Sequence, residues 1–354
     1  MAVTLTDLAT LGALPFDEVI DVRAPAEYAE DHIPGAISLP VLSDLERAQV
    51  GTIYTQSSRF EARKVGAALV ARNAARHLEG ALRDRPGGWR PLVYCWRGGQ
   101  RSGSFASILA QIGWRVDTID GGYRSYRRLV VRAMHETPLP HRLVLLDGDT
   151  GTAKTALLHR LAARGHQVLD LEGLAAHRGS IFGAVARPQP AQKAFEGALA
   201  VRLAAMDPAR PVLAEAESSR IGALQIPPSL WAAMGAAPRL RVAAPVAARA
   251  RYLVRAYAEL TADAGRIAPL LDGLRRLQGH ARVDRWQQLA AGGAFEALAD
   301  ELIREHYDRR YRRHRSRRGA PADPEIALDS LDEPALDAAA ARLEAALEQL
   351  APPA

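Results

Sequence analysis

Short apolar runs alternate with longer stretches of helical periodicity along the first third of the chain. Residues 18–23, 92–95 and 116–119 have the length and composition of strands, and residues 60–78 carry apolar side chains at helical spacing. Strands that alternate with helices are typical of a parallel sheet with helices packed on its faces. We therefore expect an α/β domain with a parallel sheet here.

Two prolines, Pro138 and Pro140, interrupt this alternation. A second α/β unit follows, and after residue 243 the pattern is mostly helical. We predict two domains, residues 1–134 and residues 135–354. In the second domain the expected strands lie at 142–146, 166–170 and 211–215, and helices are expected at 154–164 and over an Ala/Leu/Glu-rich segment at 323–350.

The single cysteine of the chain, Cys95, stands at the end of the expected strand 92–95. A loop and the expected helix 102–112 follow it. Backbone N–H groups of such a loop, together with a helix N-terminus, favour a bound anion and lower the pKa of a thiol. We predict that Cys95 is a nucleophile, although a lone cysteine is often only a small buried apolar residue. The residues expected to hold an anionic donor are Trp96, Arg97, Gly98, Gly99, Gln100 and Arg101.

Three parts of this region together resemble a rhodanese domain over residues 16–128. The first consists of residues 21–23, 27–28 and 32–36, the second is the Cys95 loop, and the third is residues 119–123. The resemblance implies that the cysteine carries sulfur as a persulfide, and that Asp21 and His32 are structural. Five residues separate Cys95 from Arg101, one more than in the usual rhodanese loop. This spacing also resembles cysteine-dependent phosphatases, which leaves a phosphatase as an alternative. The larger loop suits a phosphate-bearing donor better than thiosulfate.

Residues 143–155 have the context of a phosphate-binding P-loop, since an apolar strand enters a glycine-containing loop and a helix leaves it. Lys154 is one of only three lysines in the chain, and Ala153 replaces the glycine that normally precedes this lysine. The substitution favours the binding of an anion or diphosphate over ordinary nucleotide hydrolysis. The alternative is an ordinary strand–turn–helix. The predicted diphosphate ligands are Gly148, Thr150, Gly151, Lys154 and Thr155.

Carboxylates follow two expected strands of the second domain. Asp170 and Glu172 come after one strand, and Glu215 and Glu217 end the other. Such residues hold a metal ion or orient water in P-loop folds, and they equally cap helices. The pattern leaves both roles open, and it does not identify a metal; a Mg²⁺ ion on the bound phosphate is one reading. Further candidates for the same pocket are His177, Arg178 and Ser180.

Seven arginines lie within residues 309–318, with tyrosines interleaved. The formal net charge is +6, which permits a nucleic-acid partner without requiring one. Such a run is either a solvated surface or an RNA contact that binds phosphates and stacks a base. The candidate RNA contacts are Tyr307, Arg309, Arg310, Tyr311, Arg312 and Arg313.

The composition is that of an ordinary globular chain, with 48% hydrophobic residues and one cysteine. No run of about 18 uncharged apolar residues occurs, so we expect no membrane-spanning helix. The N-terminus lacks the features of a secretory signal, and one cysteine cannot form an internal disulfide framework. We expect a cytoplasmic protein with no membrane partner.

A rhodanese domain followed by a P-loop domain is an unusual pairing, and further segments match one family. These are residues 50–54, 60–62, 95–99, 113–114 and 120–124 in the first domain, and residues 170–175, 177–180, 182–183, 189–190 and 195–196 in the second. Together they resemble the bacterial tRNA 2-selenouridine synthases over nearly the whole chain.

The resemblance implies that the chain replaces the sulfur of 2-thiouridine at the tRNA wobble position with selenium from selenophosphate. It also implies an S-geranylated intermediate made from geranyl diphosphate, and no tightly bound cofactor. Cys95 would be the nucleophile or selenium carrier, and the loop around Lys154 would bind the diphosphate. Two further alternatives remain: a rhodanese-type sulfurtransferase with an accessory nucleotide-binding domain, and an RNA-binding protein without enzymatic activity.

Overall fold

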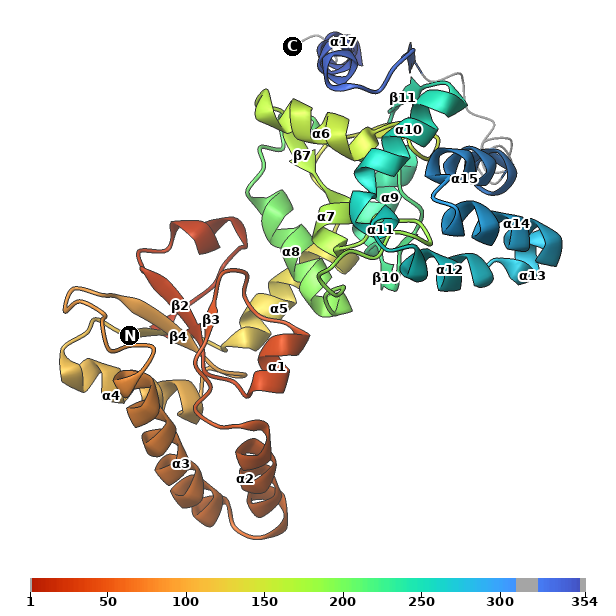
Figure 1. Ribbon diagram of the computed structural model, residues 1–354. Coiled ribbons are helices and arrows are strands. Elements are labelled where there is room, and N and C mark those ends of the chain that lie inside the picture. The colour runs from red at the N-terminus through yellow and green to blue at the C-terminus, as the bar shows by residue number, and fades with distance from the viewer. Residues whose placement is uncertain (1, 310–323, 351–354) are drawn as a thin grey trace. The chain divides into compact units, whose positions relative to one another are not determined.

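The computed structural model describes residues 2–309 and 324–350, and these form two compact units (Figure 1). The first unit comprises Met1–Leu139, Pro190–Ala205 and Pro227–Ser229. The second comprises Pro140–Gln189, Met206–Ile226 and Leu230–Ala354. The first unit therefore includes a helix, α8 (Gln192–Ala204), that comes later in the chain than the P-loop.

The first unit is built on a five-stranded parallel sheet, as the alternating pattern predicts. Its central strand carries Leu92 and Val93, both without solvent exposure, because a strand covered on both faces needs apolar side chains on both. Cys95 follows this central strand directly. The strand order is β1 (Ala2–Val3), β5 (Asp117–Ile119), β4 (Pro91–Tyr94), β2 (Glu18–Asp21) and β3 (Ile37–Ser38).

Helices surround this sheet and pack a core that includes Val93, Phe105 and Leu109. Gly113 ends the helix after Cys95 by adopting a φ of 109°, a left-handed conformation that glycine accepts without strain. A 3₁₀ turn covers Ala9–Ala13, and α5 continues as a π-helical turn at Arg132–Glu136. The helices are α1 (Pro25–Glu30), α2 (Asp44–Gln56), α3 (Arg59–Glu79), α4 (Gln100–Ile112), α5 (Tyr123–Val131) and α8.

The second unit contains another five-stranded parallel sheet, and its central strand leads into the predicted P-loop. The strand order is β12 (Glu325–Ala327), β11 (Arg239–Ala243), β6 (Leu143–Gly148), β8 (Val212–Glu215) and β7 (Gln167–Leu169). A separate two-stranded hairpin is formed by β9 (Arg220–Ile221) and β10 (Leu224–Gln225). The predicted class, a P-loop-like α/β domain with parallel strands, is confirmed.

The prediction of one helical segment over 323–350 is wrong at its start. Residues Glu325–Ala327 form β12, which pairs in parallel with β11. Ile326 is buried between exposed Glu325 and Ala327, so this short stretch has the alternation of an edge strand, which the Ala/Leu/Glu-rich composition after it obscures. The helix α17 begins only at Glu333 and continues to Leu350.

Helices supply most of the remaining structure of the second unit (Figure 1). Several of them form a core of their own around Trp286, Leu271 and Val283. In the part of the chain that the structure describes, no helix is long and apolar enough to cross a bilayer. The helices are α6 (Lys154–Ala163), α7 (Leu171–Ala175), α9 (Pro228–Ala236), α10 (Val246–Ala256), α11 (Ala258–Thr261), α12 (Ala264–Asp272), α13 (Arg275–Gln278), α14 (His280–Ala291), α15 (Phe295–Leu302) with a π-helical turn at Ile303–Tyr307, and α17.

Candidate functional sites: a thiol loop and a P-loop with an apolar pocket

Cys95 lies at the carboxyl end of the central strand β4, and only 4% of its surface is exposed. The Ser102 hydroxyl, from the first turn of α4, donates a hydrogen bond to its sulfur at 3.2 Å. The same hydroxyl lies 3.2 Å from the carbonyl oxygen of Gly99. The thiol is therefore fixed between the strand and the start of the helix, which is the position the sequence predicts for a nucleophile.

Two glycines bring the loop close to the next segment of the chain. Gly98 has a φ of 65°, and a Cβ there would lie 2.5 Å from the carbonyl oxygen of Ile119 and 3.0 Å from the amide nitrogen of Gly121. Gly122 has a φ of 57°, and a Cβ there would collide with the carbonyl oxygen of Cys95. Larger residues at either position would separate the Cys95 loop from the turn after β5.

The Cys95 thiol has a pKa below the ordinary value for cysteine. Burial alone raises it, since a thiolate loses its hydration in the interior. The hydrogen bonds from the hydroxyl and backbone N–H of Ser102, the positive charge of Arg101 and the backbone N–H of Arg97 together outweigh burial. The loop therefore stabilises a negative charge at the sulfur, as an anion cradle would.

The two arginines of the loop have different surroundings. Arg101 donates to Glu27 at 2.8 Å, and Glu27 also pairs with Arg47 at 2.8 Å. Arg97 is exposed, as are Gly99 and Gln100. Arg101 thus contributes its charge to the thiol from within an ion pair, whereas Arg97 presents its guanidinium to solvent. That these residues hold an anionic donor remains a prediction.

Aromatic residues pack against the Cys95 loop. Trp96 stacks on Tyr123 with ring centroids 5.1 Å apart, and the backbone N–H of Tyr123 donates to the carbonyl oxygen of Cys95 at 2.8 Å. The buried guanidinium of Arg23 lies over the Tyr123 ring at 4.0 Å and pairs with Asp21 at 2.6 Å. Asp21 therefore holds Arg23 against the Tyr123 ring, a structural role such as the rhodanese resemblance implies.

The predicted P-loop connects β6 to α6. The Lys154 side chain folds back over the loop and donates to the carbonyl oxygen of Gly148 at 2.9 Å. Arg249, only 3% exposed, donates to the carbonyl oxygen of Thr150 at 2.9 Å and pairs with Asp308 at 2.6 Å. Arg249 of α10 thus holds the P-loop in position. The free backbone N–H groups at the N-terminus of α6 are available to an anion bound at the loop.

Ala153 takes the conformation that the missing glycine would have. Its φ is 63° and its ψ is 27°, in the left-handed region, and it caps the N-terminus of α6. Its methyl group is 3% exposed and belongs to the core between α6 and the sheet. The Cβ therefore places Ala153 alone in an unfavourable backbone conformation. The strand–loop–helix arrangement around it is retained.

Carboxyl groups gather behind the P-loop. Thr155 donates to Glu172 at 3.0 Å. Burial, together with the nearby Glu217 carboxyl, raises the pKa of Glu172 to about 7, although Lys154 and Thr155 oppose the shift. Burial likewise raises the pKa of Glu217. This pair can hold a proton at neutral pH, which reduces the negative charge beside the P-loop.

The neighbouring carboxylates serve local structure. Asp170 caps α7 by accepting from the backbone N–H of Gly173 at 2.7 Å, and it pairs with His159 at 2.9 Å. Glu215 is fully buried and accepts from the backbone N–H of Leu171 at 3.0 Å. Of the two roles left open by the sequence, the capping role is therefore seen at these positions. Among the described residues, no group of three or more His, Cys, Asp or Glu side chains is arranged to hold a metal ion.

The segment that contains His177, Arg178 and Ser180 lies against α10 and α11. Arg178 donates to the carbonyl oxygen of Ala256 at 3.0 Å, pairs with Glu259 at 2.7 Å and stacks over Tyr257 at 4.6 Å. Ser180 lies 3.4 Å from the Tyr257 hydroxyl. His177 accepts from the backbone N–H of Gly179 at 3.1 Å, and burial lowers its pKa. Arg178 therefore positions this segment, and Ser180 reaches a pocket.

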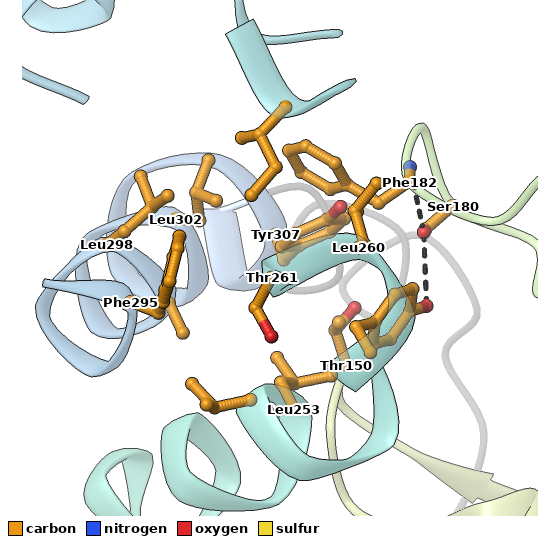
Figure 2. Close-up of a pocket in the computed structure, with 14 residues that line it drawn as sticks. Thr150, Ser180, Phe182, Leu253, Leu260, Thr261, Phe295, Leu298, Leu302 and Tyr307 are labelled. Atoms are coloured by element: carbon orange, nitrogen blue, oxygen red, sulfur yellow. Dashed lines mark hydrogen bonds between the residues drawn. The ribbon is translucent and has the colours of Figure 1, made fainter. Parts of the chain in front are cut away.

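An apolar pocket begins at Thr150 of the P-loop and extends among the helices α10, α11, α12 and α15 (Figure 2). Ser180, Thr261 and the hydroxyl groups of two tyrosines are the other polar side-chain groups among residues that are otherwise aliphatic or aromatic. The sequence did not predict this pocket. It is lined by Thr150, Ser180, Phe182, Leu253, Val254, Tyr257, Leu260, Thr261, Ile267, Phe295, Leu298, Ala299, Leu302 and Tyr307.

Two of the predicted tRNA contacts lie among the described residues. Tyr307 lines the apolar pocket, so its ring is half-buried rather than presented to solvent. Arg309 is exposed and pairs with Glu305 at 2.8 Å. The other four, Arg310, Tyr311, Arg312 and Arg313, lie outside the residues that the structure describes.

Comparison with known proteins identifies both units. The family model described as "tRNA 2-selenouridine synthase AAA domain" matches residues 141–323, and the model of the rhodanese-like domain matches residues 6–129.

Several relatives carry the name tRNA 2-selenouridine synthase, among them the following three proteins. The protein from Nitrosomonas europaea is 37% identical, over 60% of this chain and 56% of its own length. The protein from Hahella chejuensis is 36% identical, over 83% of this chain and 72% of its own length. The protein from Chromohalobacter salexigens is 33% identical, over 87% of this chain and 91% of its own length.

Proposed function

The chain belongs to the tRNA 2-selenouridine synthase family, and we propose from this premise that it exchanges the sulfur of 2-thiouridine at the wobble position of tRNA for selenium. Selenophosphate is the proposed selenium donor, and an S-geranylated base made from geranyl diphosphate is the proposed intermediate. The two sites suit two chemically different donors. The thiol loop offers N–H groups and arginines to a tetrahedral anion, and the P-loop offers Lys154 to a diphosphate.

The observation that carries the geranyl step is the continuity of the P-loop with the apolar pocket. Thr150 belongs to both, and Leu253, Phe295 and Leu302 line the pocket beyond it. A nucleotide would place a polar ribose and base next to the phosphates, whereas a prenyl diphosphate places a hydrocarbon chain there. Burial of apolar surface favours the hydrocarbon by about 0.8 kcal/mol per CH₂ group. This arrangement supports geranyl diphosphate over a nucleotide.

The first proposed step alkylates the base. The sulfur of 2-thiouridine attacks the first carbon of the geranyl chain, the carbon–oxygen bond to the diphosphate breaks, and the proton on N3 is released. Lys154 and the N–H groups of the loop stabilise the charge that develops on the leaving diphosphate. The protonated form of the Glu172–Glu217 pair lowers the repulsion that two carboxylates would exert on this anion.

The second proposed step uses Cys95. Its thiolate attacks the phosphorus of selenophosphate, the phosphoryl group moves to sulfur, and selenide is released without a change in its oxidation state. Water then hydrolyses the sulfur–phosphorus bond, which releases phosphate and restores the thiol. Selenide then attacks C2 of the base, the bond to the geranylated sulfur breaks, and the thiol that leaves takes a proton. A perselenide on Cys95 would instead require a two-electron oxidant, so attack at phosphorus is the route we propose.

Nucleoside mass spectrometry tests this function. The full chain is incubated with tRNA that contains 2-thiouridine, with geranyl diphosphate and selenophosphate added separately and together. We expect a geranylated base with the first donor alone and selenouridine with both. Unchanged 2-thiouridine in every reaction would contradict the proposed function. Release of phosphate from an aryl phosphate, or turnover of thiosulfate, would then favour the phosphatase or the sulfurtransferase.

Three variants separate the two sites. Cys95→Ala should still form the geranylated base but no selenouridine, because the donor site has lost its nucleophile. Lys154→Ala should lose geranylation, because the diphosphate has lost its cation. Lys193→Ala removes a lysine on α8 that pairs with Glu30 at 2.6 Å, and it should behave like the parent chain. Full selenation by Cys95→Ala would disprove the role of the thiol.

A further inference from the structure

Two aromatic side chains are exposed at the turn between α2 and α3, in the rhodanese-like unit. Phe60 is 67% exposed and Tyr54 is 50% exposed. Aromatic side chains normally lose most of their surface to the core, because their burial is strongly favourable. Two of them on one turn therefore indicate a surface that contacts something other than the core of this unit.

Hydrogen bonds fix both ends of the hairpin formed by α2 and α3. Ser43 and Glu46 form a reciprocal capping box at the start of α2, and Ser58 accepts from the backbone N–H groups of Phe60 and Glu61 at the start of α3. Asn73, 7% exposed, donates from α3 to Glu46 at 2.9 Å and thereby ties the two helices together. Ser58 therefore caps the helix start that carries Phe60, whereas the contacts of Ser43, Glu46 and Asn73 hold the opposite end of the hairpin, away from the rings. The hairpin is thus ordered before a ligand binds.

Positive charges surround the rings. Arg59 lies over the Tyr54 ring, with its guanidinium 5.5 Å from the centroid. Arg63 and Lys64 lie one helical turn after Phe60 and are exposed. Lys64 pairs with Glu61, but both side chains are largely in solvent, and such a pair contributes about 1 kcal/mol at most. Phosphates can therefore compete for these cations at small cost.

We propose that the tip of the α2–α3 hairpin, defined as Tyr54, Arg59, Phe60, Arg63 and Lys64, is an RNA-binding surface that contacts the tRNA substrate. The aromatic rings stack unpaired bases, and the cations bind the adjacent phosphates. This inference rests on the proposed function for the identity of the RNA.

The composition of the tip favours RNA over a protein partner. The buried centres of protein–protein interfaces are depleted in charged residues, and lysine is rare there. At the hairpin tip, by contrast, Arg63 and Lys64 accompany Phe60 on one side of the helix, and Arg59 covers Tyr54. Alternating rings and cations are the arrangement that a single-stranded segment of RNA requires, since each nucleotide offers one base and one phosphate.

Equilibrium binding of 2-thiouridine tRNA to the full chain tests the inference, with the salt concentration varied. Phe60→Ala should raise the Kd about fivefold or more, because stacking of one base contributes about 1–3 kcal/mol. Arg63→Ala should raise the Kd and reduce the slope of log Kd against log salt by about one. Ile112→Ala, a matched control that removes an apolar side chain 52% exposed on α4, should leave the Kd unchanged.

Three outcomes decide between the readings. If the parent chain and Phe60→Ala bind tRNA equally, the inference is overturned. If Phe60→Ala also changes the molar mass measured by light scattering while tRNA binding stays the same, the surface belongs to a second copy of the chain instead. If the parent chain neither binds nor modifies tRNA, the proposed function itself fails. Melting curves of each variant establish that it is folded.

Discussion

Ala153 shows how one residue can depart from a motif while the motif keeps its geometry. The left-handed conformation costs an alanine about 1–2 kcal/mol. Its buried methyl group recovers about 0.8 kcal/mol, and alanine loses less backbone entropy on folding than glycine. These contributions nearly cancel, so the alanine does not prevent the P-loop from forming. The kind of ligand that the P-loop accepts then depends on the residues that line the adjoining pocket.

Ser102 determines the reactivity of Cys95 at the same scale. Ser102→Ala removes the hydroxyl that donates to the sulfur, and a hydrogen bond to a charged group contributes about 1.5–3 kcal/mol. The thiol pKa should therefore rise by about one to two units, and the pH at which alkylation by iodoacetamide reaches half its limiting rate should rise by the same amount. The measurement is the rate of alkylation against pH, which should shift to higher pH. Alkylation of a cysteine reports on Cys95 alone, because the chain has one cysteine.

Ser107→Ala is the control, because that hydroxyl also donates to a backbone carbonyl of α4, that of Gly103, but does not contact the thiol. Its alkylation profile should match that of the parent chain. An unchanged profile for Ser102→Ala would mean that the backbone and Arg101 alone stabilise the thiolate.

The sequence was sufficient to place Cys95 and Lys154 between a strand and a helix, since each stands in a local pattern that needs no tertiary information. It was not sufficient for Ser102 or Arg249, whose partners are the sulfur atom and the carbonyl oxygen of Thr150. A serine in a helix and one arginine among 43 carry no local sign of such contacts. Only the folded chain brings them to the site.

At the scale of elements, the Cys95 loop depends on a close crossing with the turn after β5. Gly98 fills that crossing, whereas a Cβ on its neighbour Gly99 would meet no atom within 4 Å. The apolar pocket is likewise a property of elements rather than of a motif. Its leucines come from three helices, α10, α11 and α15, and have the spacing of ordinary core residues, so their sequence pattern could not distinguish a pocket from a core.

Gly98→Ala and Gly99→Ala test this crossing as a matched pair. The first places a methyl group 2.5 Å from a carbonyl oxygen and requires a left-handed conformation, so it should cost about 2 kcal/mol or more and reduce the reactivity of the thiol. The second should change either property only slightly. Thermal unfolding and thiol alkylation measure both effects. Equal behaviour of the two variants would contradict the crossing.

At the scale of the whole molecule, the sequence predicted two α/β parts with parallel sheets because both contain long alternating patterns. It mistook the start of the 323–350 segment because a three-residue strand is too short for its alternation to stand out. In the structure this segment completes the P-loop unit. Leu336, Leu343 and Leu347 of α17 pack into the core beside α6, and Arg160 of α6 pairs with Asp337.

The apolar face of α17, rather than its ion pairs, should hold it in place. Leu343 is fully buried, so Leu343→Ala should cost about 2–5 kcal/mol in unfolding free energy. Asp337 is 65% exposed, so Asp337→Ala should cost at most about 1 kcal/mol despite losing a 2.9 Å contact with Arg160. Denaturant unfolding of the full chain compares the two variants. A larger cost for Asp337→Ala would reverse this assignment.

The position of β12 has a consequence for biosynthesis. Strand β11 ends at Ala243, but the strand that covers its open edge begins about 80 residues later, at Glu325. At about 5–20 residues per second, a ribosome needs roughly 4–16 s to make this interval. Throughout that time the growing chain exposes β11 as an open sheet edge, which can pair with other strands. Premature termination before β12 should therefore yield an insoluble product, even though every residue of the P-loop is present.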